Sequence, residues 1–152
     1  GYMVKLKPIM ETLDLVIVSA EWGEGKRSNW LSSFTLACLN ENDEFVTIGK
    51  MATGLTEEQF KEITERLRKL IIWESGREVR VKPEVVVEVA YEEIQKSPTY
   101  SSGYALRFPR LIRVRWDKGP EEADDLRRIE KIYKRNKQRP YDYLIRSLRD
   151  FT

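Results

Sequence analysis

Histidine is absent from this chain of 152 residues, and there is a single cysteine, Cys38. Imidazole general-base catalysis and His-containing metal sites are therefore excluded, and one cysteine cannot form a zinc cluster or an internal disulfide. The glycine-rich phosphate-binding patterns GxxxxGK(S/T) and GxGxxG are also missing. These absences predict a chain that holds no metal and catalyses no reaction on its own.

Long apolar runs are missing as well. Apolar residues make up 41% of the chain, but no run approaches the ~18–20 residues that span a bilayer. No secretory signal is visible at the start. We therefore expect an intracellular protein, cytoplasmic or in a eukaryote nuclear, that is not secreted and makes no membrane contact.

The charges are nearly balanced overall but unevenly distributed along the chain. The formal net charge is only +2. Acidic residues gather at 41–65 and 84–93, whereas cations gather at 26–27, 107–118 and 127–149. This separation suggests one face for a polyanion and another for solvent or a protein partner.

Strand patterns dominate the first two thirds of the chain. Residues 13–22, 33–39 and 44–52 are predicted strands, and Thr56 with Gln59 forms a capping box that opens a helix. A β-branched strand (83–94), a loop (97–105) and an Arg-rich strand follow. This order predicts an all-β fold with helical additions: a five-stranded Greek-key OB-fold barrel with one helix after the third strand.

Beyond Pro120 the pattern changes to helical spacing. Residues 121–137 and 141–151 form two amphipathic candidates that make up a C-terminal helical appendage. A terminal segment with a weak apolar stripe usually docks onto something. The sequence leaves open whether it docks on its own barrel or on another domain.

The stretch LRFPRLIRVRWDKGP at 106–120 is the most informative part of the chain. From Leu111 onward its alternation predicts a half-buried strand, with Ile112, Val114 and Trp116 on one face and Arg113 and Arg115 on the other. Guanidinium groups held on a rigid strand suit bidentate contact with phosphate oxygens. A solvated basic strand without any ligand is the alternative.

Several segments together resemble one enzyme family. RFPRLIRVRWDK at 107–118 resembles motif VI of ATP-dependent DNA ligases of the archaeal and eukaryotic replicative type, and Lys5-Leu6-Lys7 resembles the motif V lysine pair. Further matches, in family order, are TLDLVIVSAEWGEGKR at 12–27, SSFTLACL at 32–39, GKMATGL at 49–55 and KPEVVVEV at 82–89. The adenylating KxDG motif is absent, so the resemblance implies the OB domain of a longer enzyme.

The resemblance also implies domain boundaries and roles. Residues 1–8 would end an adenylation domain at a hinge, 9–123 would form the OB-fold domain, and 124–152 a C-terminal extension. Arg115 and Lys118 would contact the β- and γ-phosphates of ATP, with Asp117 as an orienting partner. The full expected sets are Arg113, Arg115, Asp117 and Lys118 for catalysis; Lys5, Lys7, Arg107 and Arg110 for the cofactor; and Gly23, Gly25, Lys26, Arg27, Ser28 and Asn29 for DNA.

The longer enzyme would use ATP and Mg²⁺, and its partners would be its own adenylation domain and nicked duplex DNA. The isolated domain would be monomeric, bind neither ATP nor Mg²⁺ tightly, and be inactive. Two other interpretations stay open: a stand-alone OB-fold module that binds nucleic acid, and a fragment of an mRNA-capping-type nucleotidyltransferase. A stand-alone module should expose aromatic side chains as stacking platforms.

Overall fold

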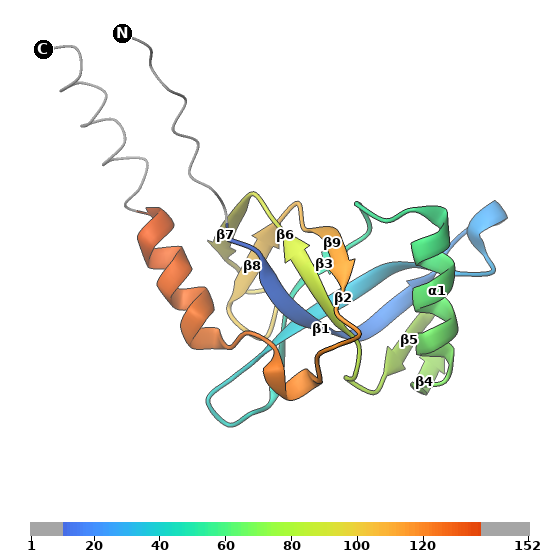
Figure 1. The fold of residues 1–152 in the computed structure, drawn as a ribbon, viewed down its shortest axis with the longest axis horizontal. Helices are drawn as coiled ribbons and strands as arrows, with labels where there is room; N and C mark the ends of the chain where they lie inside the picture. The colour runs from blue at the N-terminus through green and yellow to red at the C-terminus, as the bar shows by residue number, and fades with distance from the viewer. Residues whose placement is uncertain (1–10, 138–152) are drawn as a thin grey trace, which may run out of the picture.

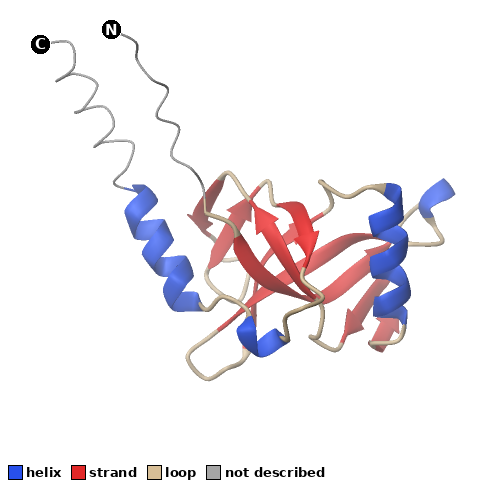
Figure 2. Ribbon diagram, in the orientation of Figure 1, coloured by secondary structure: helices blue, strands red, loops and turns tan. Residues whose placement is uncertain are grey.

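Strands form the centre of the protein, and helices lie at its periphery (Figure 2). The structure is a computed structural model that describes residues 11–137. Its helices are α1 (Glu57–Arg68) and a helix over residues 126–137, with 3₁₀ turns η1 (Gly25–Arg27) and η2 (Pro120–Glu122). The strands are β1 (Leu13–Trp22), β2 (Leu31–Leu39), β3 (Phe45–Met51), β4 (Ile71–Ser75), β5 (Glu78–Val81), β6 (Val86–Ala90), β7 (Glu93–Lys96), β8 (Tyr104–Arg107) and β9 (Arg110–Val114).

The long strand β1 organises the barrel (Figure 1). One edge of β1 pairs with β2, and the other pairs with β6 along its first half and with β5 along its second. β2 pairs with β3, and β6 pairs with β9. A parallel bridge between Thr53 and Arg110 joins the end of β3 to β9 and closes the ring. The barrel strands are thus β1, β2, β3, β9 and β6, which confirms the predicted five-stranded OB-fold.

Alternation along β1 decides what faces the core and what faces outward. Leu13, Leu15 and Ile17 are fully buried, whereas Asp14 lies between the first two and points to the outside of the barrel. Cys38 on β2 is buried in the same core, and burial raises the pKa of its thiol to about 12. That thiol is therefore a small apolar packing group rather than a nucleophile.

Helix α1 begins where the sequence predicts. The Thr56 hydroxyl accepts a hydrogen bond from the Gln59 backbone N–H, and the Gln59 side chain accepts one from the Thr56 N–H. Phe60, Ile63 and Leu67 recur on one face of the helix and are buried against the barrel. The capping box and the apolar stripe are both confirmed.

Two short hairpins are the main differences from the prediction. β4 and β5 pair in the stretch between α1 and Pro83, where no strand was predicted, and β8 begins inside the expected loop at 97–105 and pairs with β7. β4 is an edge strand whose Ile72 is 62% exposed, so it lacks the buried alternation by which strands are recognised.

The 126–137 helix packs on the domain's own barrel. Ile129 and Ile132 are buried in the main core cluster, and Tyr104 meets Tyr133 edge to face with ring centroids 5.3 Å apart. The helix predicted for 121–137 is therefore confirmed over 126–137, while the candidate helix at 141–151 lies outside the described residues. No helix within 11–137 is long and apolar enough to cross a membrane.

Closure of the barrel depends on a glycine. Leu111 donates its N–H to the Thr53 carbonyl (3.1 Å), directly beside Gly54, which has φ +87°. A Cβ atom at Gly54 would lie 2.7 Å from the Leu111 nitrogen and 2.8 Å from its oxygen. A side chain here would therefore push β9 away from β3.

We predict that Gly54→Ala destabilises the domain by about 2 kcal/mol or more, because it adds a backbone clash to the strain of a positive φ. Gly76→Ala is the matched control, since Gly76 has φ +60° but nothing within 4 Å of the added Cβ. Urea unfolding of the two variants measures the difference. Equal losses of stability would contradict the role given to Gly54.

Candidate functional site

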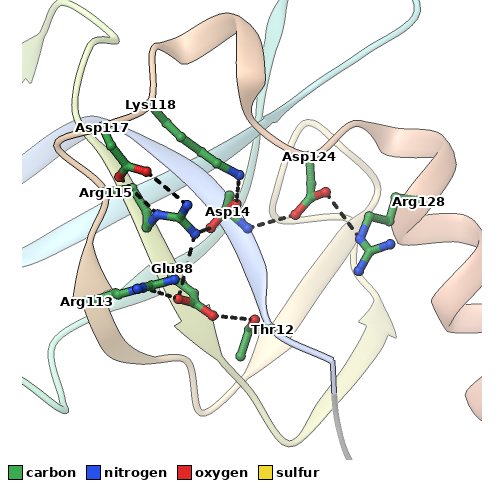
Figure 3. A network of polar contacts seen from close by, with 9 residues as sticks. All are labelled: Thr12, Asp14, Glu88, Arg113, Arg115, Asp117, Lys118, Asp124 and Arg128. Atoms are coloured by element: carbon green, nitrogen blue, oxygen red, sulfur yellow. Dashed lines mark hydrogen bonds and ion pairs between the residues drawn. The ribbon is translucent and has the colours of Figure 1, made fainter.

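Three charged side chains form a row across the outer wall of the barrel (Figure 3). Asp14 on β1 is paired in register with Glu88 on β6, and Glu88 with Arg113 on β9. The Arg113 Nε donates to Glu88 Oε1 at 2.7 Å, and the Thr12 hydroxyl donates to the other Glu88 oxygen at 2.7 Å. The row brings the Arg-rich strand against two carboxylates that the sequence analysis did not assign to the site.

Arg115 is the most enclosed cation of the group, and carboxylates surround it. Its Nε and Nη2 donate to the two oxygens of Asp117, both at 3.2 Å. Its Nη1 lies 3.6 Å from Asp14 and 3.9 Å from Glu88, and only 16% of its side chain is exposed. Both oxygens of Asp117 therefore hold the Arg115 guanidinium, and the orienting role expected of Asp117 stays a prediction.

Lys118 lies in the turn after β9, where its N–H bonds to the Arg115 carbonyl at 3.1 Å. Its Nζ is 2.6 Å from Asp14 Oδ2, and 26% of its side chain is exposed. An ammonium group has three donors. Among the described residues Asp14 is its one ion-pair partner, so Lys118 has donor capacity left for a further acceptor.

The four expected catalytic residues thus lie together. With Asp14 and Glu88 they form a cluster of three cations and three carboxylates, which we call the β9 cluster: Asp14, Glu88, Arg113, Arg115, Asp117 and Lys118. Hydrogen bonds from Thr12 and then Arg113 hold the pKa of Glu88 below its usual range, and those from Arg115 do the same for the pKa of Asp117. The hydrogen bond with Asp117 raises the pKa of Arg115 in turn.

The predicted apolar face of β9 is confirmed only at Val114, which packs against the core, and is wrong at Ile112 and Trp116. Leu111 is buried, whereas Ile112 is 45% and Trp116 50% exposed. In the register of β6 and β9, Glu88 pairs with Arg113 and the next residue, Val89, pairs with Leu111. Ile112 is therefore an extra residue in β9 that has no partner on β6. This β-bulge interrupts the alternation and turns Ile112 outward.

The remaining cations of the stretch lie on the surface near its beginning. Arg107 pairs loosely with Glu92 and Glu93, at 4.0 and 3.8 Å, and has its guanidinium 5.3 Å from the ring of Phe108. No ion pair of Arg110 occurs within 11–137. Phe108 is 63% exposed at φ +51°, an uncommon conformation for a bulky residue, and the sequence carried no signal of it.

The loop expected to contact DNA follows the last residue of β1, at the end of that strand far from Asp14 (Figure 1). Lys26, Ser28 and Asn29 are exposed, together with Gly25 at φ +60°. Gly23 is buried instead and donates its N–H to the Trp30 carbonyl, which closes the base of the loop. Arg27 also lies in this loop, within η1.

The loop and the β9 cluster are well separated. A strand rises about 3.3 Å per residue, so the two ends of β1 are about 30 Å apart along the strand. Asp14 lies near one end, and the loop follows Trp22 at the other. Lys5 and Lys7 lie outside the described residues, and no group of carboxylates or Cys38 within 11–137 is arranged to hold a metal ion.

Asp14 and Glu88 are the site residues that sequence reasoning missed. Each is an isolated acid inside an apolar strand, in LDLVIV and VVVEVA. An acid at such a position faces outward, and two of them on neighbouring strands are matched to the cations of β9. The sequence pattern showed that each acid faces outward. Only the fold sets the strand register that places the two acids side by side.

Comparison with known proteins gives a consistent result. The family described as the ATP dependent DNA ligase C terminal region matches residues 27–118. The DNA ligase of Methanococcoides burtonii is 61% identical over 131 residues, which are 86% of this chain and 23% of that protein. The DNA ligase of Nanoarchaeum equitans is 55% identical over 141 residues, 88% of this chain and 25% of that protein. The chain spans about a quarter of the length of these curated relatives.

Solved structures of ligases share the fold. The ligase domain of LigD from M. tuberculosis superposes with a TM-score of 0.62 at 27% identity, over 74% of this chain and 38% of that one. A mycobacterial DNA ligase D complexed with ATP and MES gives a TM-score of 0.58 at 23% identity, over 77% of this chain and 38% of that one.

The acid stability of the domain should depend on Glu88. Its pKa is lowered from 4.5, so the folded state gains stability from the ionised form above that pH and loses it as the pH falls through the lowered pKa. We predict that Glu88→Gln flattens the fall of the unfolding midpoint below about pH 4.5, and that Thr12→Val does so in part. Thermal unfolding between pH 7 and pH 3 measures this, and an unchanged acid slope in both variants would contradict it.

Proposed function

The chain belongs to the family of C-terminal regions of ATP-dependent DNA ligases, and from that premise we propose that it supplies cations to the adenylation step of a longer ligase. In that step a lysine of an adenylation domain attacks the α-phosphate of ATP and pyrophosphate leaves. Cations that meet the leaving group neutralise its developing charge and hold it in line. The β9 cluster is the group of side chains that suits this task. The observation that carries the proposal is that Lys118 is only partly buried and has one ion-pair partner among the described residues, Asp14.

The cluster supports a division of roles among its cations. Arg113 is 62% exposed and bonds to Glu88 through Nε, and Lys118 has donors to spare, so both can reach an incoming phosphate oxygen without giving up their partners. Arg115 has carboxylates on each of its three nitrogens. Direct contact between Arg115 and a triphosphate, as the resemblance implies, requires that it exchange a carboxylate oxygen for a phosphate oxygen.

ATP suits this cluster better than Mg²⁺ does. Phosphate oxygens accept the N–H donors of lysine and arginine. A magnesium ion requires free carboxylate and water oxygens in octahedral geometry, whereas Asp14, Glu88 and Asp117 are all paired with cations. We therefore assign no Mg²⁺ ligand to the described residues, and any Mg²⁺ used by the longer enzyme would be held elsewhere.

Nicked duplex DNA is the proposed partner of the loop at the far end of β1. Backbone contacts from Lys26, Ser28 and Asn29 would position the duplex without reading its sequence, as nick sealing requires. Because the loop and the β9 cluster lie about 30 Å apart along β1, one domain can present one end to the nucleotide and the other to DNA. This placement supports a swing of the domain between the two steps.

A stand-alone module that binds single strands is the second candidate. Exposure of Phe108 and Trp116 favours it, because aromatic side chains beside arginines make stacking platforms. The two proposals differ in the nucleic acid they prefer: nicked duplex for a ligase domain, single strands for a stacking module.

We predict that Lys118→Ala in the longer ligase lowers the rate of self-adenylation about 100-fold or more, as loss of one charge-stabilising donor does. Sealing of pre-adenylated nicked DNA should stay near the parent rate, since the pyrophosphate has already left. Single-turnover assays of the two steps measure this. Lys50→Ala, at an exposed lysine that pairs with Glu21, is the matched control. Equal losses in both steps would overturn the proposed function.

The loop can be tested separately through the salt dependence of DNA binding. Each phosphate contact contributes about 0.9 to the slope of log K against log salt, so Lys26→Ala should reduce the slope for nicked duplex by about 1. Lys50→Ala should leave the slope unchanged. An unaltered slope in Lys26→Ala would exclude the loop from the interface, and tighter binding of single strands than of nicked duplex would favour the second candidate.

A further inference from the structure

Asp14 connects the two most enclosed cations of the β9 cluster. One of its oxygens lies 2.6 Å from the Lys118 ammonium and the other 3.6 Å from Arg115 Nη1. Its side chain is only 16% exposed, so these pairs are partly shielded from water. An ion pair in that setting is stronger than one on the open surface.

The backbone of Asp14 is fixed on both sides. Leu13 and Leu15 are fully buried in the core and hold β1 in place. The Asp14 N–H donates to the Asp124 carboxylate at 2.7 Å, and its carbonyl accepts the Asp124 N–H at 2.9 Å. Arg128 of the 126–137 helix in turn lies 3.2 Å from Asp124. Asp14 is therefore anchored both to the barrel and to that helix (Figure 3).

Within residues 11–137 Lys118 has no comparable anchor of its own. The pairing of β9 with β6 ends at Arg115, whose N–H bonds to the Val86 carbonyl at 2.8 Å. Lys118 lies three residues further on, in a turn closed by its hydrogen bond to Arg115. Since the carboxylate is fixed and the lysine is not, Asp14 determines where the Lys118 ammonium lies, and not the reverse.

The ion pair between Asp14 and Lys118 leaves the ammonium group able to contact a phosphate oxygen as well. The ammonium group can keep Asp14 on one donor and offer the others to a phosphate oxygen. A flexible four-carbon stem without this partner would sample many rotamers, and a misplaced catalytic contact can cost about 100-fold in rate. The fixed carboxylate thus restricts Lys118 before the nucleotide arrives.

We propose that Asp14 is a positioning residue for enzyme adenylation, which holds Lys118 at the place where the leaving phosphates are met. The inference rests on the proposed function, because it gives Asp14 a role only through Lys118. It assigns no contact between Asp14 and the nucleotide, which its negative charge would repel. Its effect therefore belongs to the adenylation step and not to nick sealing.

The test is Asp14→Asn in the longer ligase, which removes the charge and keeps the size and the backbone bonds to Asp124. We expect self-adenylation at saturating ATP to fall between about 10- and 100-fold, with sealing of pre-adenylated DNA unchanged. Glu21→Gln is the matched control, since Glu21 also lies on β1 and pairs with a lysine, Lys50, at 3.3 Å. It should leave both steps at the parent rate.

A double-mutant cycle with Lys118→Ala separates positioning from general stability. If Asp14 acts through Lys118, the double variant adenylates no more slowly than Lys118→Ala alone. Multiplying losses, or an equal loss in sealing, would overturn the inference. A normal adenylation rate in Asp14→Asn beside a crippled Lys118→Ala would overturn it too, but would leave the proposed function intact. A normal rate in Lys118→Ala would instead refute the proposed function itself.

If Asp14→Asn is too unstable to assay, Asp14→Glu takes its place. The glutamate retains the charge but moves it one methylene further from β1, so Lys118 is held in a shifted position. Self-adenylation should again fall while sealing persists. A rate equal to that of the parent enzyme would overturn the inference.

Discussion

The site depends on ion pairs between carboxylates on rigid strands and cations at the end of another strand. Asp14 on β1 and Glu88 on β6 lie side by side because the two strands are in register, and β9 brings Arg113 and Arg115 against them. The barrel core fixes the carboxylates, since the neighbours of Asp14 on β1 are fully buried. The cations beyond the ladder take their positions from these acids. In the sequence these cations form a basic stretch with few acids nearby. In the fold they are paired with carboxylates from other strands.

Because of this pairing, Arg113, Arg115 and Lys118 differ in the number of hydrogen-bond donors left for a further acceptor. Arg115 donates to both oxygens of Asp117 and lies near Asp14 and Glu88, whereas Arg113 and Lys118 keep donors for another acceptor. The same strand that carries Asp14 ends in the loop of Lys26, and this places the two proposed contacts at opposite ends of one rigid element. The 126–137 helix is connected to the β9 cluster through Asp124. Arg128 of the helix pairs with Asp124, and the Asp124 carboxylate accepts the N–H of Asp14. Burial raises the pKa of Asp124, so its ionised form depends on these partners.

Much of the fold could be predicted from local patterns, and the site only in part. β1 occupies the predicted residues 13–22, and the Thr56 cap of α1 is confirmed, because both follow from local periodicity and side-chain chemistry. The bulge at Ile112 could not be predicted, since it arises only when β9 meets β6. The edge strand β4 was missed because its residues are exposed and show no alternation, whereas the alternation of Val79 and Val81 in β5 was present in the sequence and was overlooked. Asp14 and Glu88 were missed for a related reason: the register between strands distant in sequence decides which acids meet which cations.

In the proposed role, Lys118 is held by Asp14 and meets the phosphates of ATP in the longer enzyme. The most direct measurement is a crystal structure of that enzyme with a non-hydrolysable ATP analogue. We expect the Lys118 ammonium within about 3 Å of a β- or γ-phosphate oxygen, with its contact to Asp14 retained. A structure in which other side chains bind these phosphates, while Lys118 remains paired with Asp14 alone and distant from the nucleotide, would contradict it.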